Sequence, residues 1–179
     1  MLLIRHGQSE FNAVFNRTRV DPGIRDPRLT ELGRAQAREI AGELAAYGIG
    51  RIIASPYSRA IETALLIAER VGAEIEIDPS VGERAAYVCD IGSSPAELKR
   101  RFPALEFGHL DDPWFHDHET LGRHETEDEI AARGRRFRER AAGFPDRSEV
   151  LVVTHWGFIR ALTGQEVKNA QVVRLQFDD

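Results

Sequence analysis

The stretch "LLIRHGQSEFN" at residues 2–12 decides the fold. Leu2–Ile4 is a short apolar run, which is typical of a buried strand, and Arg5, His6 and Gly7 follow it directly. Two later apolar runs also end in polar side chains. Ile52–Ala54 is followed by "SPYSR", and Val150–Val153 is followed by "TH". We therefore expect several buried strands with reactive side chains at their ends.

Helical patterns separate these strands. One helix is expected from Thr30 to Gly48, a second from Ser55-Pro56 to Gly72, a third from Thr126 to about Ala142, and a short one up to Gly164. Glu74–Ile77 is expected to be another strand, 95–101 a short helix and 173–177 an edge strand, whereas 13–28 is expected to be a loop. Strands that alternate with helices predict an α/β fold, a three-layer sandwich with a mainly parallel central sheet and helices on both faces.

Length and composition predict one domain over residues 1–179. Residues 80–125 have no clear hydrophobic period, and we interpret them as an insertion that forms a lid or contacts the substrate.

The net charge of −5 argues against general binding of nucleic acid. The longest aliphatic stretch, at 64–68, is far shorter than the ~20 residues that span a bilayer, and no signal peptide is recognisable. We expect a cytoplasmic protein without a membrane partner; the sequence indicates no oligomeric state.

Ligands of open α/β sheets bind at the carboxyl ends of the strands. If the three apolar strands are neighbours, His6 and His155 converge there with two arginines, Arg5 and Arg59. Arginine pairs with phosphate oxygens in a bidentate way, and histidine can attack phosphorus when its other ring nitrogen is held by a hydrogen bond. The convergent side chains therefore suit a phosphoryl group.

Four ordered blocks carry a resemblance to a known family. They are "RHGQSEFN" (5–12), "DPRLTELGRAQA" (26–37), "SPYSRAIETA" (55–64) and "VVTHWGFIRAL" (152–162). In this order they resemble the histidine phosphatase superfamily, the phosphoglycerate mutase-like proteins, and they extend over most of the chain. The Arg-His-Gly motif alone is a weak signal, but four blocks in the family's order are a specific one.

The resemblance implies roles for six residues. His6 resembles the nucleophile that becomes phosphohistidine, and a proton donor is expected after the third strand, where Glu83 stands in "DPSVGERAAY". Asp78 and Asp90 are the nearest alternatives to Glu83 as the proton donor. The phosphate pocket is expected to contain Arg5, His6, Arg59 and His155, with support from Asn12. The resemblance implies no metal and no cofactor, because arginines neutralise the phosphoryl charge.

The resemblance leaves the reaction and the substrate open. The segment "GERAAYVCDIG" (82–92) departs from the block of the phosphoglycerate mutases after Glu83-Arg84, which favours hydrolysis of a phosphomonoester. Phosphoglycerate mutase-type transfer and a weakly active regulatory protein that binds a phosphorylated ligand are the alternatives. The expected partner is a small phosphorylated metabolite or another phosphomonoester.

Two other groups of residues could form a site. Histidines and aspartates between 109 and 124 raise the question of a zinc or manganese site, but their spacing matches no ligand motif, and a lid with Trp114 and Phe115 as anchors is favoured. Cys89 is not expected to be a phosphatase nucleophile, because such a cysteine needs an arginine six residues on, where Pro95 stands.

Overall fold

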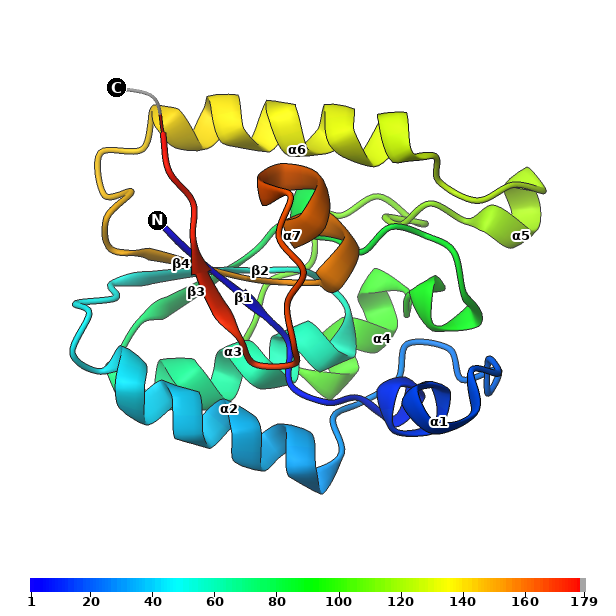
Figure 1. Cartoon of the computed structure of the whole chain (residues 1–179), viewed down its shortest axis with the longest axis horizontal. Coiled ribbons are helices and arrows are strands. Elements are labelled where there is room, and N and C mark those ends of the chain that lie inside the picture. The colour runs from blue at the N-terminus through cyan, green and yellow to red at the C-terminus, as the bar shows by residue number, and fades with distance from the viewer. Residues whose placement is uncertain (178–179) are drawn as a thin grey trace.

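The computed structural model describes residues 1–177, and its centre is one five-stranded sheet (Figure 1). The strands have the order β3-β2-β4-β1-β5, and only β5 runs antiparallel to its neighbour. Their bounds are β1 Leu2–Arg5, β2 Arg51–Ala54, β3 Glu74–Ile77, β4 Val150–Thr154 and β5 Val172–Arg174. The predicted mainly parallel sheet is therefore confirmed, and β1 and β2 flank β4 at its centre.

Helices cover both faces of the sheet, as the α/β sandwich requires. Helices α2 and α3 lie on one face, and α6 and α7 lie on the other (Figure 1). The remaining helices lie around the edge of the sheet where β1, β2 and β4 end. The helices are α1 Glu10–Thr18, α2 Glu31–Leu44, α3 Ser58–Val71, α4 Pro95–Arg101, α5 His118–Leu121, α6 Glu127–Ala142 and α7 Trp156–Thr163.

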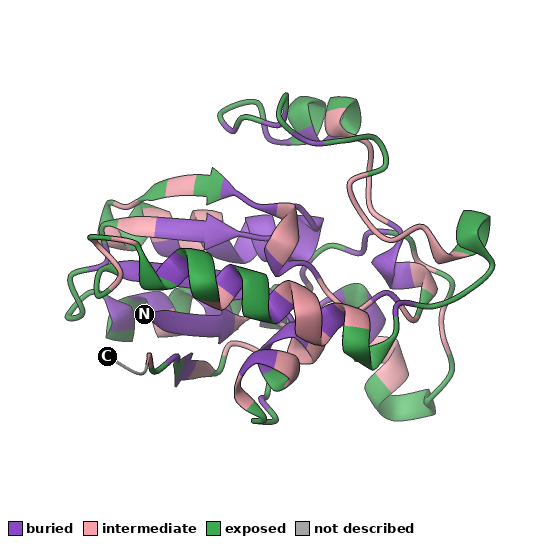
Figure 2. Ribbon diagram, turned by 90° about the horizontal axis from the view of Figure 1, so that it is seen from above, coloured by how far each residue is buried: buried purple, intermediate pink, exposed green. Residues whose placement is uncertain are grey.

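The alternation of side chains along each strand builds two cores. In β1, Leu2 and Ile4 pack in the cluster that contains α2 and α3, whereas Leu3 packs in the cluster that contains α6 and α7. In β4 all five residues are buried, because helices cover both of its faces. Figure 2 shows the buried residues concentrated in the sheet and on the helix faces toward it. In the described part of the chain, no helix is long and apolar enough to cross a membrane.

Several predicted boundaries were wrong. Helix α2 ends at Leu44 and not at Gly48, because residues 45–48 form turns, and the edge strand is Val172–Arg174 and not 173–177, because within 172–177 only these three residues pair with β1.

Residues 13–28 are not all loop, because α1 continues to Thr18; its N-cap is Ser9, in a capping box closed by Asn12 rather than by the usual glutamate or glutamine. Helix α3 begins at Ser58 and not at Pro56. Its first amide is bound by Asp26, a residue distant in sequence, whose carboxylate accepts bonds from both N and Oγ of Ser58 (2.8 and 2.6 Å).

Residues 80–125 hold little regular structure, as expected. They contain α4, α5 and the 3₁₀ turn η2 (Val88–Asp90), and another 3₁₀ turn, η1 (Pro79–Val81), leads into them. Although irregular, this segment is not wholly exposed, since η2 buries Cys89 and Asp90 and α4 buries Leu98. Part of it is therefore fixed against the sheet.

The loop after β1 packs directly against the start of α2. The amide of Thr30 donates to the carbonyl of Gln8 (3.0 Å), and Gly33 lies so close to this loop that an added Cβ would be 2.1 Å from the oxygen of Gln8. A second glycine of α2, Gly42, is exposed and has no atom within 4 Å of an added Cβ. Of the two glycines of α2, Gly33 is the one that a close approach requires.

We expect Gly33→Ala to lower the free energy of unfolding by about 1–3 kcal/mol, because the added methyl group forces the two segments apart. The matched change Gly42→Ala should raise it by about 0.5–1 kcal/mol, because alanine is a better helix former than glycine. Urea denaturation measures both values. Equal effects of the two substitutions would contradict the close approach.

Candidate active site

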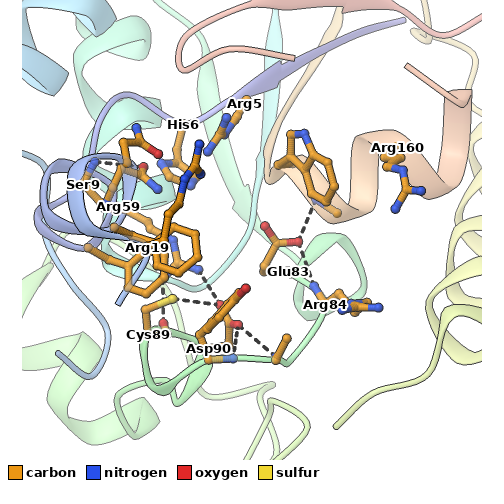
Figure 3. Close-up of a pocket in the computed structure, with 18 of the residues that line it drawn as sticks. Arg5, His6, Ser9, Arg19, Arg59, Glu83, Arg84, Cys89, Asp90 and Arg160 are labelled. Carbon is orange, nitrogen blue, oxygen red and sulfur yellow. Dashed lines mark hydrogen bonds and ion pairs between the residues drawn. The ribbon is translucent and has the colours of Figure 1, made fainter. Parts of the chain in front are cut away.

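A cavity of about 550 Å³ opens at the carboxyl ends of β1, β2 and β4 (Figure 3). Five of the six residues to which the resemblance assigned roles line it: Arg5, His6, Asn12, Arg59 and Glu83. They come from β1, the loop after it, α1, α3 and the segment after β3. The parallel strands bring these distant residues together because their carboxyl ends share one edge of the sheet.

The ring of His6 is held in one tautomer. Its Nδ1 lies 2.7 Å from the carbonyl oxygen of Gly7, and a carbonyl oxygen can only accept, so Nδ1 carries the proton. The Nε2 atom is then left with a free lone pair when the ring is neutral. Burial, together with the charges of Arg59 and Arg5, holds the pKa of His6 well below its usual value of 6.5. The ring is therefore neutral at physiological pH, as a nucleophile must be.

The two arginines are fixed by backbone oxygens and one carboxylate. Nη1 of Arg5 donates to the carbonyl of Val167 (2.9 Å), while its buried Nε has no hydrogen-bond partner among residues 1–177. Arg59 is almost wholly buried; Nη1 donates to the carbonyl of Cys89 (2.8 Å) and Nη2 to Oδ1 of Asp90 (3.1 Å). Both guanidinium groups keep further N–H donors, so both can bind an anion in the cavity.

His155 lies beside His6 but does not line the cavity. The two ring centroids are 5.1 Å apart with an angle of 59° between the planes, and His155 is fully buried. Its Nε2 is 2.8 Å from Oγ of Ser55, and its Nδ1 has no hydrogen-bond partner within the described residues. Burial and the charge of Arg59 hold the pKa of His155 well below its usual value, so this ring is also neutral. We expected His155 in the phosphate pocket; the structure places it in ring contact with His6.

Glu83 faces the cavity from the opposite side to His6 (Figure 3). Its Oε1 accepts hydrogen bonds from the amides of Arg84 (2.8 Å) and Gly157 (2.9 Å). Gly157 permits this contact, because an added Cβ would lie 2.4 Å from Oε1. Burial, and secondarily the charge of Asp90, raises the pKa of Glu83 to about 7. Such a carboxyl group can both give and take a proton near neutral pH.

The alternatives to Glu83 are occupied elsewhere. Asp90 lines the cavity, but its carboxylate binds Arg59 and the amides of Ala86 and Tyr87 (both 3.0 Å). Asp78 lines a different cavity, where it pairs with Arg140 and accepts a bond from the amide of Ser80. Of the three carboxylates, Glu83 is the one that faces the cavity without pairing to an arginine.

Several residues that support the site were missed from the sequence. Asn12 binds Nδ2 of Asn169 through its Oδ1 (3.1 Å), and the same Nδ2 donates to the carbonyl of His6 (3.1 Å). Thr63 accepts a hydrogen bond from the amide of Gly7 (3.1 Å). Asn169 lies in a polar segment before β5, and no local pattern in the sequence distinguishes it. Its contact with the loop after β1 depends on the tertiary fold.

Among residues 1–177, no group of three or more histidine, cysteine, aspartate or glutamate side chains could hold a metal ion. Two histidines of the segment 109–124 instead form hydrogen bonds with backbone carbonyls. Nε2 of His109 lies 2.8 Å from the carbonyl oxygen of Ile77, and Nε2 of His116 lies 3.0 Å from that of Arg123. Burial raises the pKa of Cys89, so this thiol is protonated and a poor nucleophile.

The fold and the cavity define a class of α/β protein in which a buried neutral histidine, two arginines and a carboxyl group meet at the ends of parallel strands. Comparison with known families agrees with this description. The family described as "Histidine phosphatase superfamily (branch 1)" matches residues 1–178. The chain therefore belongs to the histidine phosphatase superfamily, as the sequence blocks predicted.

The curated relatives of this chain include proteins named as probable phosphoglycerate mutases. A protein of Erwinia tasmaniensis named "Probable phosphoglycerate mutase GpmB" is 30% identical over 156 residues, which are 86% of this chain and 67% of that protein. A protein of the same name from Enterobacter sp. (strain 638) is 40% identical over 81 residues, 45% of this chain and 36% of that protein. Matches to these relatives thus span from about a third to two thirds of their length.

Solved structures share the fold. A mycobacterial glucosyl-3-phosphoglycerate phosphatase in complex with VO3 is 26% identical, with a TM-score of 0.64, over 96% of this chain and 88% of that chain. A putative alpha-ribazole-5'-P phosphatase from Escherichia coli has a TM-score of 0.61 at 21% identity, covering 91% of this chain and 77% of that one. The second likeness concerns the fold alone.

The raised pKa of Glu83 predicts a pH-dependent cost in stability. The carboxyl group titrates near 4.5 when unfolded and near 7 when folded, so the unfolded state binds fewer protons between these values and stability falls as pH rises. Glu83→Gln removes this titration and keeps the acceptor for Gly157. We expect the variant to gain melting temperature relative to wild type, and to gain more at pH 8 than at pH 5.

Thermal unfolding followed by circular dichroism at the two pH values measures this difference. Glu139→Gln, on the exposed face of α6, is the matched control and should behave as wild type at both pH values. A gain for Glu83→Gln that is the same at pH 5 and pH 8 would show that the carboxyl group is not protonated in the folded state at pH 5.

Proposed function

We propose that this protein hydrolyses phosphomonoesters through a phosphohistidine formed on His6, without a metal ion. The observation that carries the proposal is the hydrogen bond from Nδ1 of His6 to the carbonyl of Gly7, because it leaves Nε2 as the nucleophilic atom. The arginines and the carboxyl group around the same cavity supply the other groups that phosphoryl transfer needs.

In the first step, Nε2 of His6 attacks phosphorus while Arg5 and Arg59 bind the non-bridging oxygens. The bond from phosphorus to the leaving oxygen breaks, and protonated Glu83 gives its proton to that oxygen. The products are phosphohistidine, the free alcohol and the carboxylate of Glu83. Fixed cations stabilise the charge of the transition state without reorganisation, which is the largest contribution expected here.

In the second step, water attacks phosphohistidine. The carboxylate of Glu83 takes a proton from the water, the bond from Nε2 to phosphorus breaks, and inorganic phosphate leaves. The pKa of about 7 suits both halves of the cycle, because the group exists in both protonation states near neutral pH. His155 contacts His6 from within the protein and would orient its ring.

Mutase-type phosphoryl transfer is the second candidate, because curated relatives are named probable phosphoglycerate mutases. Hydrolysis is favoured by the similarity to a solved phosphatase over 96% of the chain, and by a partly exposed site that water can reach. Phosphorus NMR on 3-phosphoglycerate separates the two reactions: a mutase accumulates the isomeric phosphoglycerate, whereas a phosphatase releases inorganic phosphate.

His6→Ala should lower the turnover of p-nitrophenyl phosphate by at least about 10³-fold, because the nucleophile is lost. Rapid mixing of the wild type with ³²P-labelled substrate should give an acid-labile, base-stable phosphoprotein that the variant does not form. His124→Ala, an exposed histidine outside the cavity, is the control, and EDTA should leave wild-type turnover unchanged. A labelled His6→Ala protein would place the nucleophile elsewhere.

Glu83→Gln should slow ethyl phosphate much more than p-nitrophenyl phosphate. Ethoxide is a poor leaving group that needs a proton, so loss of the acid should cost about 10²–10⁴-fold. p-Nitrophenolate leaves without protonation, so its first step should be affected little. Pre-steady-state release of the two alcohols measures this step alone. Equal losses for the two esters would assign the acid role to another group.

A further inference from the structure

Three aromatic rings form one wall of the active-site cavity. Phe11 and Phe15 of α1 stack at a centroid distance of 5.0 Å, and the ring of Tyr87 lies 5.4 Å from the first and 5.1 Å from the second. All three line the same cavity as His6. We call Phe11, Phe15 and Tyr87 the aromatic wall.

Of the three rings of the aromatic wall, that of Tyr87 is the most accessible to a ligand. Phe11 is buried, and the guanidinium of Arg19 lies 5.9 Å from the centroid of Phe15. Tyr87, by contrast, is 41% exposed, although it is a large side chain that packs on two other rings. An exposed aromatic side chain in the same cavity as a reactive histidine is a typical feature of a binding surface for a flat apolar group.

A short chain of bonds fixes the aromatic wall relative to the phosphate-binding end. Oδ2 of Asp90 accepts a hydrogen bond from the amide of Tyr87 (3.0 Å), while Oδ1 of the same carboxylate accepts one from Nη2 of Arg59 (3.1 Å). On the other side, Phe11 directly precedes Asn12, which lines the cavity next to His6. A group attached to a phosphoryl bound by Arg59 is thus within reach of Tyr87.

Charged side chains dominate another part of the cavity lining, where the one aromatic ring, that of Trp156, is covered by an arginine. Arg84 pairs with Glu127 there, and Arg160 lies over the ring of Trp156 with 5.3 Å between its guanidinium carbon and the centroid. The two parts of the lining therefore differ in chemistry, and an apolar ring of a ligand makes its most favourable contacts with the aromatic wall. The cavity volume of about 550 Å³ is within the range of pockets that hold a molecule of many atoms, so it exceeds the needs of a phosphoryl group alone.

We propose that the aromatic wall is a leaving-group subsite, and that the preferred substrates are phosphomonoesters whose alcohol carries an aromatic ring. This inference rests on the proposed function, because the subsite is useful only if His6 attacks the phosphoryl group. Tyr87 is the specificity-determining residue: it contacts the leaving group and takes no part in the proton or phosphoryl transfer.

The test compares 2-phenylethyl phosphate with ethyl phosphate. Both release an aliphatic alcohol of similar basicity, so a difference in kcat/KM reports contact with the ring and not the ease of bond cleavage. For the wild type, the ratio of kcat/KM for the phenylethyl ester to that for the ethyl ester should be about tenfold or more.

Tyr87→Ala should reduce this ratio about tenfold, whereas Tyr87→Phe, which keeps the ring, should retain it. Tyr47→Ala is the matched control, since Tyr47 is also exposed (54%) but lies in the turn after α2, outside the cavity lining. Phe15→Ala tests the wall at a second position, and circular dichroism confirms that each variant is folded.

The outcomes separate this inference from the proposed function. If both esters are hydrolysed with a kcat/KM ratio near one, the leaving-group subsite is overturned and the phosphatase assignment stays intact. The same holds if neither Tyr87→Ala nor Phe15→Ala changes the ratio. Absence of turnover of both esters by the wild type overturns the phosphatase assignment, and the subsite with it. A high ratio that falls in Tyr87→Ala and persists in Tyr47→Ala supports the subsite.

Discussion

The parallel pairing of β1, β2 and β4 is the constraint on which the site depends. Arg5 stands opposite Thr154, and Ala54 stands opposite Val153, so the three strands end at nearly the same level. Backbone bonds continue this alignment one residue further, from the amide of His6 to the carbonyl of Thr154 (3.0 Å). A slip of one residue would turn alternate side chains to the other face and separate His6 from His155.

Burial in this alignment has opposite effects on the two kinds of titratable group. It lowers the pKa of His6 and raises that of Glu83, so the neutral form of each is favoured. The permanent positive charge of the site is therefore left to Arg5 and Arg59. Asp90 pairs with Arg59, whereas Arg5 binds a neutral backbone carbonyl, so positive charge remains in the cavity and favours an anion.

Much of the fold could be predicted from the sequence, because β1, β2 and β4 are apolar runs buried on both faces and their helices carry clear end signals. Pro22 and Gly23 indicate a loop and obscure helix α1, which ends before them at Thr18. The start of α3 has no local signal, because its first amide is bound by Asp26, which is distant in sequence. The family resemblance singled out Glu83 as the proton donor, but the reason why Asp90 is less suited, its pairing with Arg59, is visible only in three-dimensional contacts.

The attachment of η2 to Arg59 has a consequence for how such a protein can diversify. Asp90 binds position 87 through its main-chain amide, which every residue type except proline possesses. The side chain at 87 can therefore be exchanged while the hydrogen-bond anchor of the arginine stays intact. Libraries randomised at this one codon would explore new leaving alcohols at little risk to the reaction centre, whereas changes at Asp90 would disturb both together.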